Sequence, residues 1–124
     1  MWAVATTDTF DRWFQTLGES SRAEIEAKVN LLELFGPALG RPHADTLKGS
    51  RFPNMKELRA DVAGHTLRIA FAFDTTRAAI LLLGGDKRGS SSRVFYRRLI
   101  ARADSLFSEH LTTISTSKSK RGER

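Results

Sequence analysis

The sequence predicts an α+β fold: an N-terminal strand and a helical hairpin packed on a mainly antiparallel sheet of three to five strands, with a C-terminal helix. Three patterns support this prediction. Apolar residues recur at helical spacing in the first third of the chain, alternate with polar residues across residues 55–74, and return to helical spacing after residue 92. With 124 residues, the chain is long enough for one domain with a hydrophobic core, which we assign to residues 1–111.

The first third of the chain predicts a short strand over residues 2–6 and a helical hairpin. Thr7 or Asp8 is the expected N-cap of the first helix, and Gly18 is expected to end it. Two helices joined by a few residues lie antiparallel, so both can place their apolar stripes on one face of a sheet. The stripe of the first helix consists of Phe10, Trp13, Phe14 and Leu17.

The second helix has its own start and stop signals. Ser21 and Glu24 have the spacing of a capping box, and Gly36 followed by Pro37 is expected to end the helix. The aromatic residues of both helices are therefore expected in the core rather than on a binding surface. The apolar stripe of the second helix consists of Ile25, Val29, Leu32 and Phe35.

Strict alternation across residues 55–74 predicts a β-hairpin that turns at Gly64. The register that keeps the apolar faces together pairs Leu58 with Ile69 and places Arg59 directly opposite Arg68. Like charges that face each other across a sheet are destabilising. A phosphate between the two arginines would remove the repulsion, so this pair predicts a surface that binds a polyanion.

A second interpretation of the same strands needs no ligand. Arg59 can pair with Glu57 or Asp61, and Arg68 can pair with Asp61, on a solvated face of the sheet. The pattern of residues is equally compatible with both interpretations. The position of the carboxylates in the folded chain decides between them.

The remaining strands are expected on either side of this hairpin. Residues 45–48 are a candidate edge strand inside a loop-rich, basic segment that spans residues 37–54. The apolar run of residues 78–83 is typical of a central strand that is buried on both faces. A charged loop over residues 86–89 then leads to the last helix.

The last helix is expected to start after an N-cap within residues 90–92. Its apolar face consists of Phe95, Leu99, Ala103, Leu106 and Phe107. Tyr96 is one residue off this face, near the helix start. Residues 112–124 are polar and basic, with few apolar side chains, and are expected to form a flexible tail.

Composition excludes several classes of protein. The chain has no cysteine, which excludes disulfides and thiolate metal sites and fits a cytoplasmic protein. No apolar run approaches the roughly 20 residues that a membrane span needs, and the N-terminus does not resemble a signal peptide. We therefore expect no membrane partner.

The net charge of +6 is concentrated in the sheet and in the start of the last helix. Residues 8–40 contain three basic and six acidic side chains, whereas residues 41–103 contain thirteen basic and five acidic ones. Such a concentration of cations favours a nucleic acid or an acidic protein as the partner.

The sequence lacks the motifs of several enzyme classes. It contains no glycine-rich nucleotide-binding loop and no GxSxG nucleophile motif. His43, His65 and His110 each lack a second histidine or carboxylate at metal-binding spacing, so we predict neither a metal site nor a cofactor. What remains is a group of cations with Tyr96 and Glu57. Such a group suits attack of a ribose 2′-hydroxyl on the adjacent phosphate, which needs proton transfer and cations but no metal.

Three stretches of the chain carry a family resemblance. They are RPHADTLKGSRFPNMKELRADVAGHTLRIAFAFD from Arg41, LLLGGDKRG from Leu81 and RVFYRRLI from Arg93. These stretches resemble the HigB-type toxins of the RelE-like superfamily, a group also labelled phage Gp49-like. The resemblance extends over roughly residues 2–111 and implies a RelE-like compact domain.

The resemblance also implies a function and partners. Such proteins are toxins of type II toxin–antitoxin systems that cleave mRNA, usually on translating ribosomes. They are neutralised by a small helix-turn-helix antitoxin, here expected to be HigA-like, and the pair contacts operator DNA through the antitoxin. By resemblance, the chain is expected to be a metal-independent endoribonuclease, or mRNA interferase, in the cytoplasm.

The resemblance assigns site residues by position. Arg59 and Arg68 would hold the scissile phosphate, and Tyr96 would orient a base or assist proton transfer. Some HigB toxins have histidines near the end of the last strand, where this chain has Gly85-Asp86-Lys87-Arg88, so the general base stays unassigned. The expected catalytic residues are Arg59, Arg68, Lys87 and Tyr96, and the expected RNA-binding residues are Lys48, Lys56, Arg88 and Arg93.

A different class of function is a non-catalytic, phage-derived module that binds RNA or a host protein. The two classes differ in their tolerance of Arg→Lys substitution, because lysine can replace a binding cation but cannot reproduce the bidentate contact of a catalytic arginine. A DNA-binding repressor is a weaker alternative, because the sequence contains no helix-turn-helix pattern.

Overall fold

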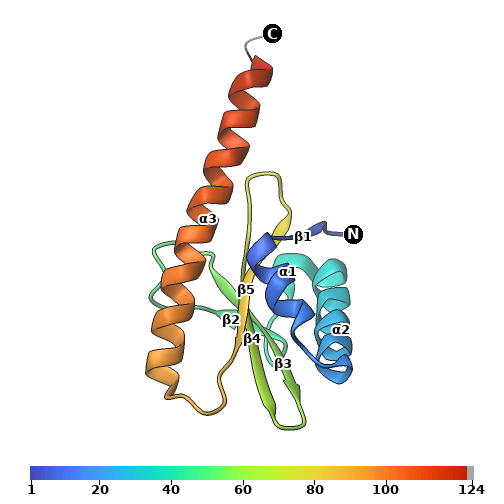
Figure 1. Cartoon of the computed structure of the whole chain (residues 1–124). Helices are drawn as coiled ribbons and strands as arrows, with labels where there is room; N and C mark the ends of the chain where they lie inside the picture. Colours follow the sequence, from blue (N-terminus) through green and yellow to red (C-terminus); the bar gives the residue numbers. More distant parts are fainter. Residues whose placement is uncertain (123–124) are drawn as a thin grey trace.

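A five-stranded sheet with the strand order β1-β5-β4-β3-β2 forms the centre of the computed structural model, which describes the backbone of residues 1–122 and the side chains of residues 1–116. All neighbouring strands are antiparallel except β1 and β5, which are parallel. The predicted α+β class with a mainly antiparallel sheet is confirmed (Figure 1). The strands are β1 (Val4–Thr6), β2 (Ala44–Thr46), β3 (Lys56–Val62), β4 (His65–Phe73) and β5 (Ala79–Asp86).

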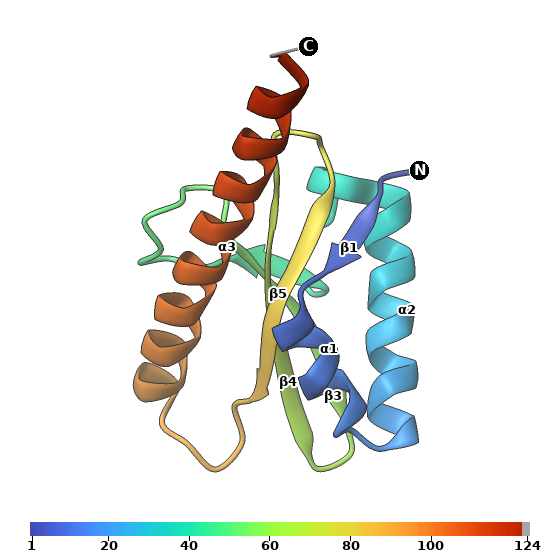
Figure 2. The ribbon, with the colours of Figure 1, turned by 45° about the horizontal axis from the view of Figure 1, so that its top comes forward.

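Helices cover both faces of this sheet. Helices α1 (Asp8–Gln15) and α2 (Glu19–Phe35) lie on one face, and α3 (Ser92–Gly122) crosses the other (Figure 2). Leu58, Ile69 and Leu81 belong to the core beneath α1 and α2, whereas Ala70 and Ala72 belong to the core beneath α3. The small side chains of these two alanines let α3 approach the sheet closely.

The predicted start of α1 is confirmed. Thr7 is its N-cap, and Thr7 Oγ1 accepts a hydrogen bond from the backbone N–H of Phe10 at 3.0 Å. The same hydroxyl donates to the carbonyl of Leu82 at 2.6 Å, which ties the beginning of α1 to β5.

The predicted capping box of α2 is wrong. The helix begins at Glu19, and Ser21 is buried inside it rather than capping it. An N-cap residue needs an extended backbone, and that backbone occurs at Gly18, where φ is −71° and ψ is 166°. The sequence placed the start three residues too late because Ser21 and Glu24 have capping-box spacing at positions that are already helical.

The end of α2 depends on Gly36. Its φ of +54° lies in the left-handed region, and a Cβ added there would lie 2.4 Å from the ring of Trp2. A short 3-10 turn, η1 (Gly36–Ala38), follows. Phe35 is 53% exposed, in contrast to its predicted place on the buried stripe, because the stripe that passes through Leu32 next reaches Gly36.

The strands agree closely with the sequence patterns. Leu58 pairs with Ile69 and Arg59 pairs with Arg68, as the alternation predicted. The predicted edge strand over residues 45–48 is β2, which starts one residue earlier and ends two residues earlier, at Thr46. The predicted central strand is β5, which continues through Gly84 and Gly85 because both remain paired with β4.

Helix α3 is longer than the sequence suggested. It begins beyond Ser91, whose Oγ accepts a hydrogen bond from the backbone N–H of Val94 at 3.2 Å. Where the sequence predicts a flexible tail from residue 112, the backbone is instead helical as far as Gly122, and residues 123–124 lie outside the described part. The hydroxyls of Thr112 and Thr113 donate to carbonyls four residues earlier, at 3.0 and 3.1 Å, so polar side chains are accommodated within the helix.

Figure 1 shows the C-terminal turns of α3 extending beyond the sheet. The assignment of one domain to residues 1–111 stays a prediction. Within the described residues, none of the helices combines the length and the apolar character that crossing a membrane requires.

Asp74 joins α3 to the turn between β4 and β5. Its Oδ1 accepts hydrogen bonds from Thr76 and from the backbone N–H of Ala78, and its Oδ2 accepts one from His110 Nε2 at 2.8 Å. Burial by itself raises the pKa of Asp74, but these hydrogen bonds outweigh burial and hold the pKa below its ordinary value. The ionised carboxylate therefore stabilises the packing of α3.

We predict that Asp74 makes the fold sensitive to acid. A carboxyl whose pKa is lower in the folded chain stabilises the fold above its unfolded pKa of about 3.9, and this contribution is lost as the pH falls through the folded pKa. Asp74→Asn should melt at a lower temperature at neutral pH and lose less stability below about pH 4. Thermal melts across this range test the prediction. The exposed Glu26→Gln should keep the native pH profile, and a native profile for Asp74→Asn would contradict us.

We also predict that Gly36→Ala destabilises the fold by about 1–3 kcal/mol, because it combines an unfavourable positive φ with a clash against Trp2. Gly40→Ala is the matched control, since no atom lies within 4 Å of its added Cβ. Urea denaturation of both variants measures the difference. Equal midpoints for the two variants would show that the close approach at Gly36 is unimportant.

Candidate functional site

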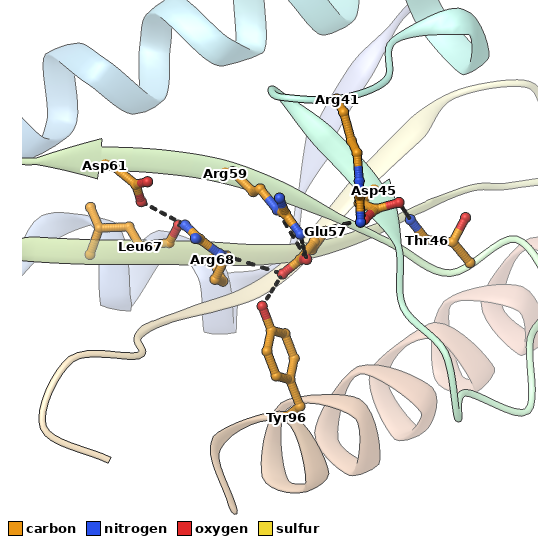
Figure 3. Close-up of polar contacts among 9 residues, drawn as sticks. All are labelled: Arg41, Asp45, Thr46, Glu57, Arg59, Asp61, Leu67, Arg68 and Tyr96. Carbon is orange, nitrogen blue, oxygen red and sulfur yellow. Dashed lines mark hydrogen bonds and ion pairs between the residues drawn. The ribbon is translucent and has the colours of Figure 1, made fainter. Parts of the chain in front are cut away.

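Four polar side chains gather where the first turns of α3 meet β3 and β4. Strand β3 supplies Glu57 and Arg59, β4 supplies Arg68, and the start of α3 supplies Tyr96 (Figure 3). Residues two apart on a strand share a face, and Arg68 is the register partner of Arg59, so the alternation of the hairpin brings three of them together. We call these four residues the polar cluster.

Glu57 lies at the centre of the polar cluster, with its side chain only 4% exposed. Its Oε1 accepts a hydrogen bond from the Tyr96 hydroxyl at 2.7 Å. Its Oε2 accepts hydrogen bonds from Arg59 Nη2 at 3.0 Å and Nε at 3.2 Å. Arg68 Nε lies 3.7 Å from Oε1. Burying a carboxylate is costly unless it is paired, and here its partners come from β3, β4 and α3.

Arg68 is buried beside this carboxylate. Its Nη1 donates to Asp61 Oδ1 at 2.7 Å and to the carbonyl of Leu67 at 2.8 Å. Burial lowers the pKa of Arg68, but Asp61 and Tyr96 outweigh burial and raise it. Among the described residues, Arg68 Nε is the one buried side-chain nitrogen or oxygen without a hydrogen-bond partner. It faces Glu57 Oε1, so the two groups interact as an ion pair rather than through a hydrogen bond.

Tyr96 stays protonated near neutral pH. Burial and then the adjacent Glu57 carboxylate raise its pKa, while Arg68 opposes this rise. The ammonium of Lys87 lies 5.6 Å from the centre of the tyrosine ring. The hydroxyl is thus a hydrogen-bond donor held against a carboxylate and surrounded by cations.

The structure confirms the ion pairs of the second interpretation of the hairpin but not its solvated face, and polyanion binding stays a prediction. Arg59 pairs with Glu57 and Arg68 pairs with Asp61, as the interpretation without a ligand requires. The face is not solvated, however, because Glu57 and Arg68 are buried beneath the start of α3. The sequence could not reveal this burial, since it depends on where α3 lies.

A cleft of about 350 Å³ opens beside the polar cluster, between β2, β3 and α3. It contains three cations and two carboxylates. Arg41 and Asp45, which the sequence analysis did not select, form an ion pair there at 2.9 Å. In the sequence, this ion pair could have been recognised only from the opposite charges of two residues four positions apart. The lining residues are Arg41, Asp45, Thr46, Leu47, Lys48, Glu57, Arg59, Tyr96 and Ile100.

The other predicted site residues divide into two groups. Lys48 lines the cleft, and Arg93 is exposed on α3, three residues before Tyr96 and therefore on the same side of the helix. Lys56 points to the opposite face of the sheet, where it donates to the carbonyl of Pro37 at 3.1 Å. Arg88 lies at the β3–β4 turn, where it donates to the carbonyl of Gly64. Of these four residues, Lys48 lines the cleft, and Arg93 is on the same side of α3 as Tyr96.

The cluster is suited to binding an anion rather than a metal ion. Within the part of the chain that the structure describes, no three His, Cys, Asp or Glu side chains form a group that could hold a metal. Arginine forks bind phosphate and carboxylate oxygens. A tyrosine hydroxyl on a carboxylate can relay a proton. The geometry therefore defines a small α+β domain with a buried cluster of paired charges beside a cleft lined by arginines.

Comparison with known proteins agrees with this class. Residues 12–108 match the family model described as phage derived protein Gp49-like (DUF891). The chain is 47% identical over 113 residues to the putative toxin HigB3 of Mycobacterium tuberculosis, an alignment that covers 87% of this chain and 96% of HigB3. It is 40% identical over 122 residues to the putative toxin HigB2 of the same organism, covering 98% of this chain but 60% of HigB2. The chain belongs to the Gp49-like family and is a HigB-type member of the RelE-like toxins.

Solved structures share the fold at low sequence identity. A mutant of the E. coli toxin RelE in the free state superposes with a TM-score of 0.58 and 10% identity, over 82% of this chain and 95% of that one. The archaeal RelE–RelB complex from Pyrococcus horikoshii OT3 gives a TM-score of 0.53 and 14% identity, over 72% of this chain and 98% of that one. The predicted RelE-like fold is confirmed.

We predict opposite shifts in the titration of Tyr96 for two variants. Glu57→Gln removes a nearby negative charge and should lower the tyrosine pKa, whereas Arg68→Gln removes a positive charge and should raise it. The chain has one tyrosine, so tyrosinate absorbance reports this residue alone. Shifts in the same direction, or no shifts, would contradict the geometry of the cluster. Glu26→Gln, on α2, should leave the titration unchanged.

Proposed function

We propose that the chain is an mRNA endoribonuclease that acts on translating ribosomes as the toxin of a type II toxin–antitoxin system. The observation that carries this proposal is the buried Glu57–Tyr96 hydrogen bond, flanked by Arg59 and Arg68 and open to a cationic cleft. Membership of the HigB-type toxins supports the same function. RNA cleavage by 2′-hydroxyl attack needs the two things this site offers, which are proton transfer and compensation of phosphate charge.

The proposed reaction forms a bond between the ribose 2′ oxygen and phosphorus and breaks the bond from phosphorus to the 5′ oxygen. Tyr96 takes the 2′ proton as it passes its own proton to Glu57, so the carboxylate is the final base. The 2.7 Å hydrogen bond between these groups supports this relay. The leaving 5′ oxygen takes its proton from water. The products are a 2′,3′-cyclic phosphate and a 5′-hydroxyl end.

The arginines have different proposed roles. Arg59 is 28% exposed and can contact the phosphate directly, where its guanidinium would stabilise the developing charge. Arg68 is 7% exposed, so it acts mainly as a fixed positive charge beside Tyr96 and Glu57. Lys87 adds positive potential at the tyrosine, while Lys48 and Arg93 are placed to bind flanking phosphates. Lys56 and Arg88 lie away from the cleft and have no part in this mechanism.

We also propose a cognate, HigA-like antitoxin as the partner in the cytoplasm, with operator DNA contacted only through that complex. Support comes from the RelE proteins of E. coli and P. horikoshii, whose structures have been solved as complexes with RelB. An antitoxin would have to cover the cleft or prevent access to the ribosome.

A cell-free translation reaction tests the proposed activity, with mapping of new 5′ ends on the mRNA and the same transcript without ribosomes as control. Cuts that appear only during translation are the expected result. Cuts in both reactions would show a ribosome-independent nuclease. Inhibited translation without cuts would favour the alternative, a non-catalytic module that binds RNA or a host protein.

Arg59→Lys provides the matched test of the site. We predict that it lowers the cleavage rate by about 100-fold or more, because a lysine keeps the charge but loses the bidentate geometry. Arg12→Lys, on the exposed side of α1, should cleave like the native protein. Circular dichroism confirms that both variants are folded. Near-native cleavage by Arg59→Lys would reject a catalytic role for this arginine.

A further inference from the structure

A carboxylate of the chain itself occupies the cleft. Oδ2 of Asp45, on the edge strand β2, lies 2.9 Å from Arg41 Nε and 3.4 Å from Arg59 Nη2. Its Oδ1 accepts a hydrogen bond from the backbone N–H of Thr46 at 2.9 Å. One oxygen held between two guanidinium groups is the arrangement that arginines adopt around a phosphate oxygen. Asp45 therefore marks the position of an anion.

Asp45 is held more weakly than the neighbouring carboxylate. It is the register partner of Glu57 across β2 and β3, so two negative charges face each other with Arg59 shared between them. Arg59 Nη2 lies closer to Glu57, at 3.0 Å, than to Asp45. Asp45 is 29% exposed and its other partner, Arg41, is 75% exposed. Ion pairs with this exposure contribute little free energy, so a competing anion can displace Asp45.

We propose that the Arg41–Arg59 cleft is a phosphate subsite for single-stranded RNA, and that Asp45 occupies it until an RNA phosphate displaces the carboxylate. This inference rests on the proposed function, which makes RNA the ligand. The subsite adjoins the polar cluster, because Arg59 and Tyr96 line the cleft as well. Arg59 would then bridge the scissile phosphate and the adjacent phosphate in the subsite, with Lys48 at the rim.

The competition persists at neutral pH. The hydrogen bond from Arg41, followed by that from the backbone of Thr46, lowers the pKa of Asp45 despite some desolvation. Asp45 is therefore ionised whenever RNA arrives. Its charge reduces the affinity of the subsite for phosphate, and its removal frees Arg41 while Arg59 keeps its pair with Glu57.

The test measures binding of a fluorescent, fully 2′-O-methylated RNA oligonucleotide, which cannot be cleaved, by fluorescence anisotropy. Asp45→Asn is nearly isosteric and keeps an oxygen for the N–H of Thr46. We predict that it binds about two- to five-fold more tightly than the native protein. Its plot of log affinity against log salt should be steeper by up to about 0.7, the contribution of one phosphate contact on a single strand, because no carboxylate has to be displaced from the arginines. A change in fold stability alone would not steepen this plot.

Two further variants complete the design. Glu26→Gln makes the same change in net charge on the exposed side of α2 and should bind like the native protein. Arg41→Gln should weaken binding more in the Asp45→Asn background than in the native one, since Arg41 is occupied by Asp45 in the native protein. Equal effects of Arg41→Gln in both backgrounds would overturn the subsite.

The outcomes separate this inference from the proposed function. If the native protein binds the oligonucleotide and Asp45→Asn binds no more tightly, the subsite is rejected while the nuclease proposal stands. If neither binds, the subsite is overturned, whereas the nuclease proposal is decided by the cell-free translation reaction. If Asp45→Asn gains affinity for a poly-glutamate peptide but not for the oligonucleotide, the cleft is a site for an acidic protein segment and the RNA subsite is rejected.

Discussion

The burial of the Glu57 carboxylate is the constraint on which the site depends. A buried anion is tolerated only when nearby donors and cations compensate it. Its compensating groups come from β3 itself, from β4 and from α3, so the sheet and the last helix must keep one relative position. Figure 3 shows Tyr96 reaching from α3 to the carboxylate between the two arginines. The polar cluster therefore holds α3 to the sheet and is also a candidate reaction centre.

The sheet face beneath α3 divides into two halves with different physical roles. Under the first half of α3, Ala70 and Ala72 share a core with Leu99 and Ala103, and this apolar half holds the helix to the sheet. Towards the β3–β4 turn the same face becomes polar, starting at Arg68. Helix α3 bridges the two halves, since its first turns provide Tyr96 and its later turns provide core residues. Groups mounted on paired strands and a packed helix are held more rigidly than groups on loops, which suits catalysis.

The excess of positive charge does not create a field of unpaired cations at the site. Arg59 and Arg68 are both paired with carboxylates. At this site, Arg41 and Lys48 in the cleft are the cations that can bind an anion without the breaking of a buried ion pair. In the proposed nuclease, the charges beside the reacting atoms would be fixed in advance, whereas those that capture substrate would stay exposed to solvent. A protein with this division can bind RNA weakly and still orient one phosphate well.

The sequence by itself determined the α+β class, the order of the elements and the register of β3 with β4. These features depend on local signals, namely the period of apolar residues, Gly64 at the turn and Gly36 at the end of α2, and a shift of one residue would have reversed every side chain of the hairpin. It also determined that Arg59 and Arg68 share one face. Reliance on local signals also explains the wrong start predicted for α2. Ser21 and Glu24 have the spacing of a capping box, although the helix is capped at Gly18.

Only the tertiary structure decided which charges meet. The burial of Glu57, its contact with Tyr96 and the position of Asp45 between two arginines each join segments that are far apart in the sequence or on different strands. Alternation within a strand predicts on which face of the sheet a side chain lies. It does not predict which element packs on that face. The path of α3 over the sheet supplies the cover, and it is set by the packing of Leu99 and Ala103 on the alanines of β4. The spacing of residues in the sequence does not predict that packing. The contacts that define the site could therefore be identified only from the tertiary structure.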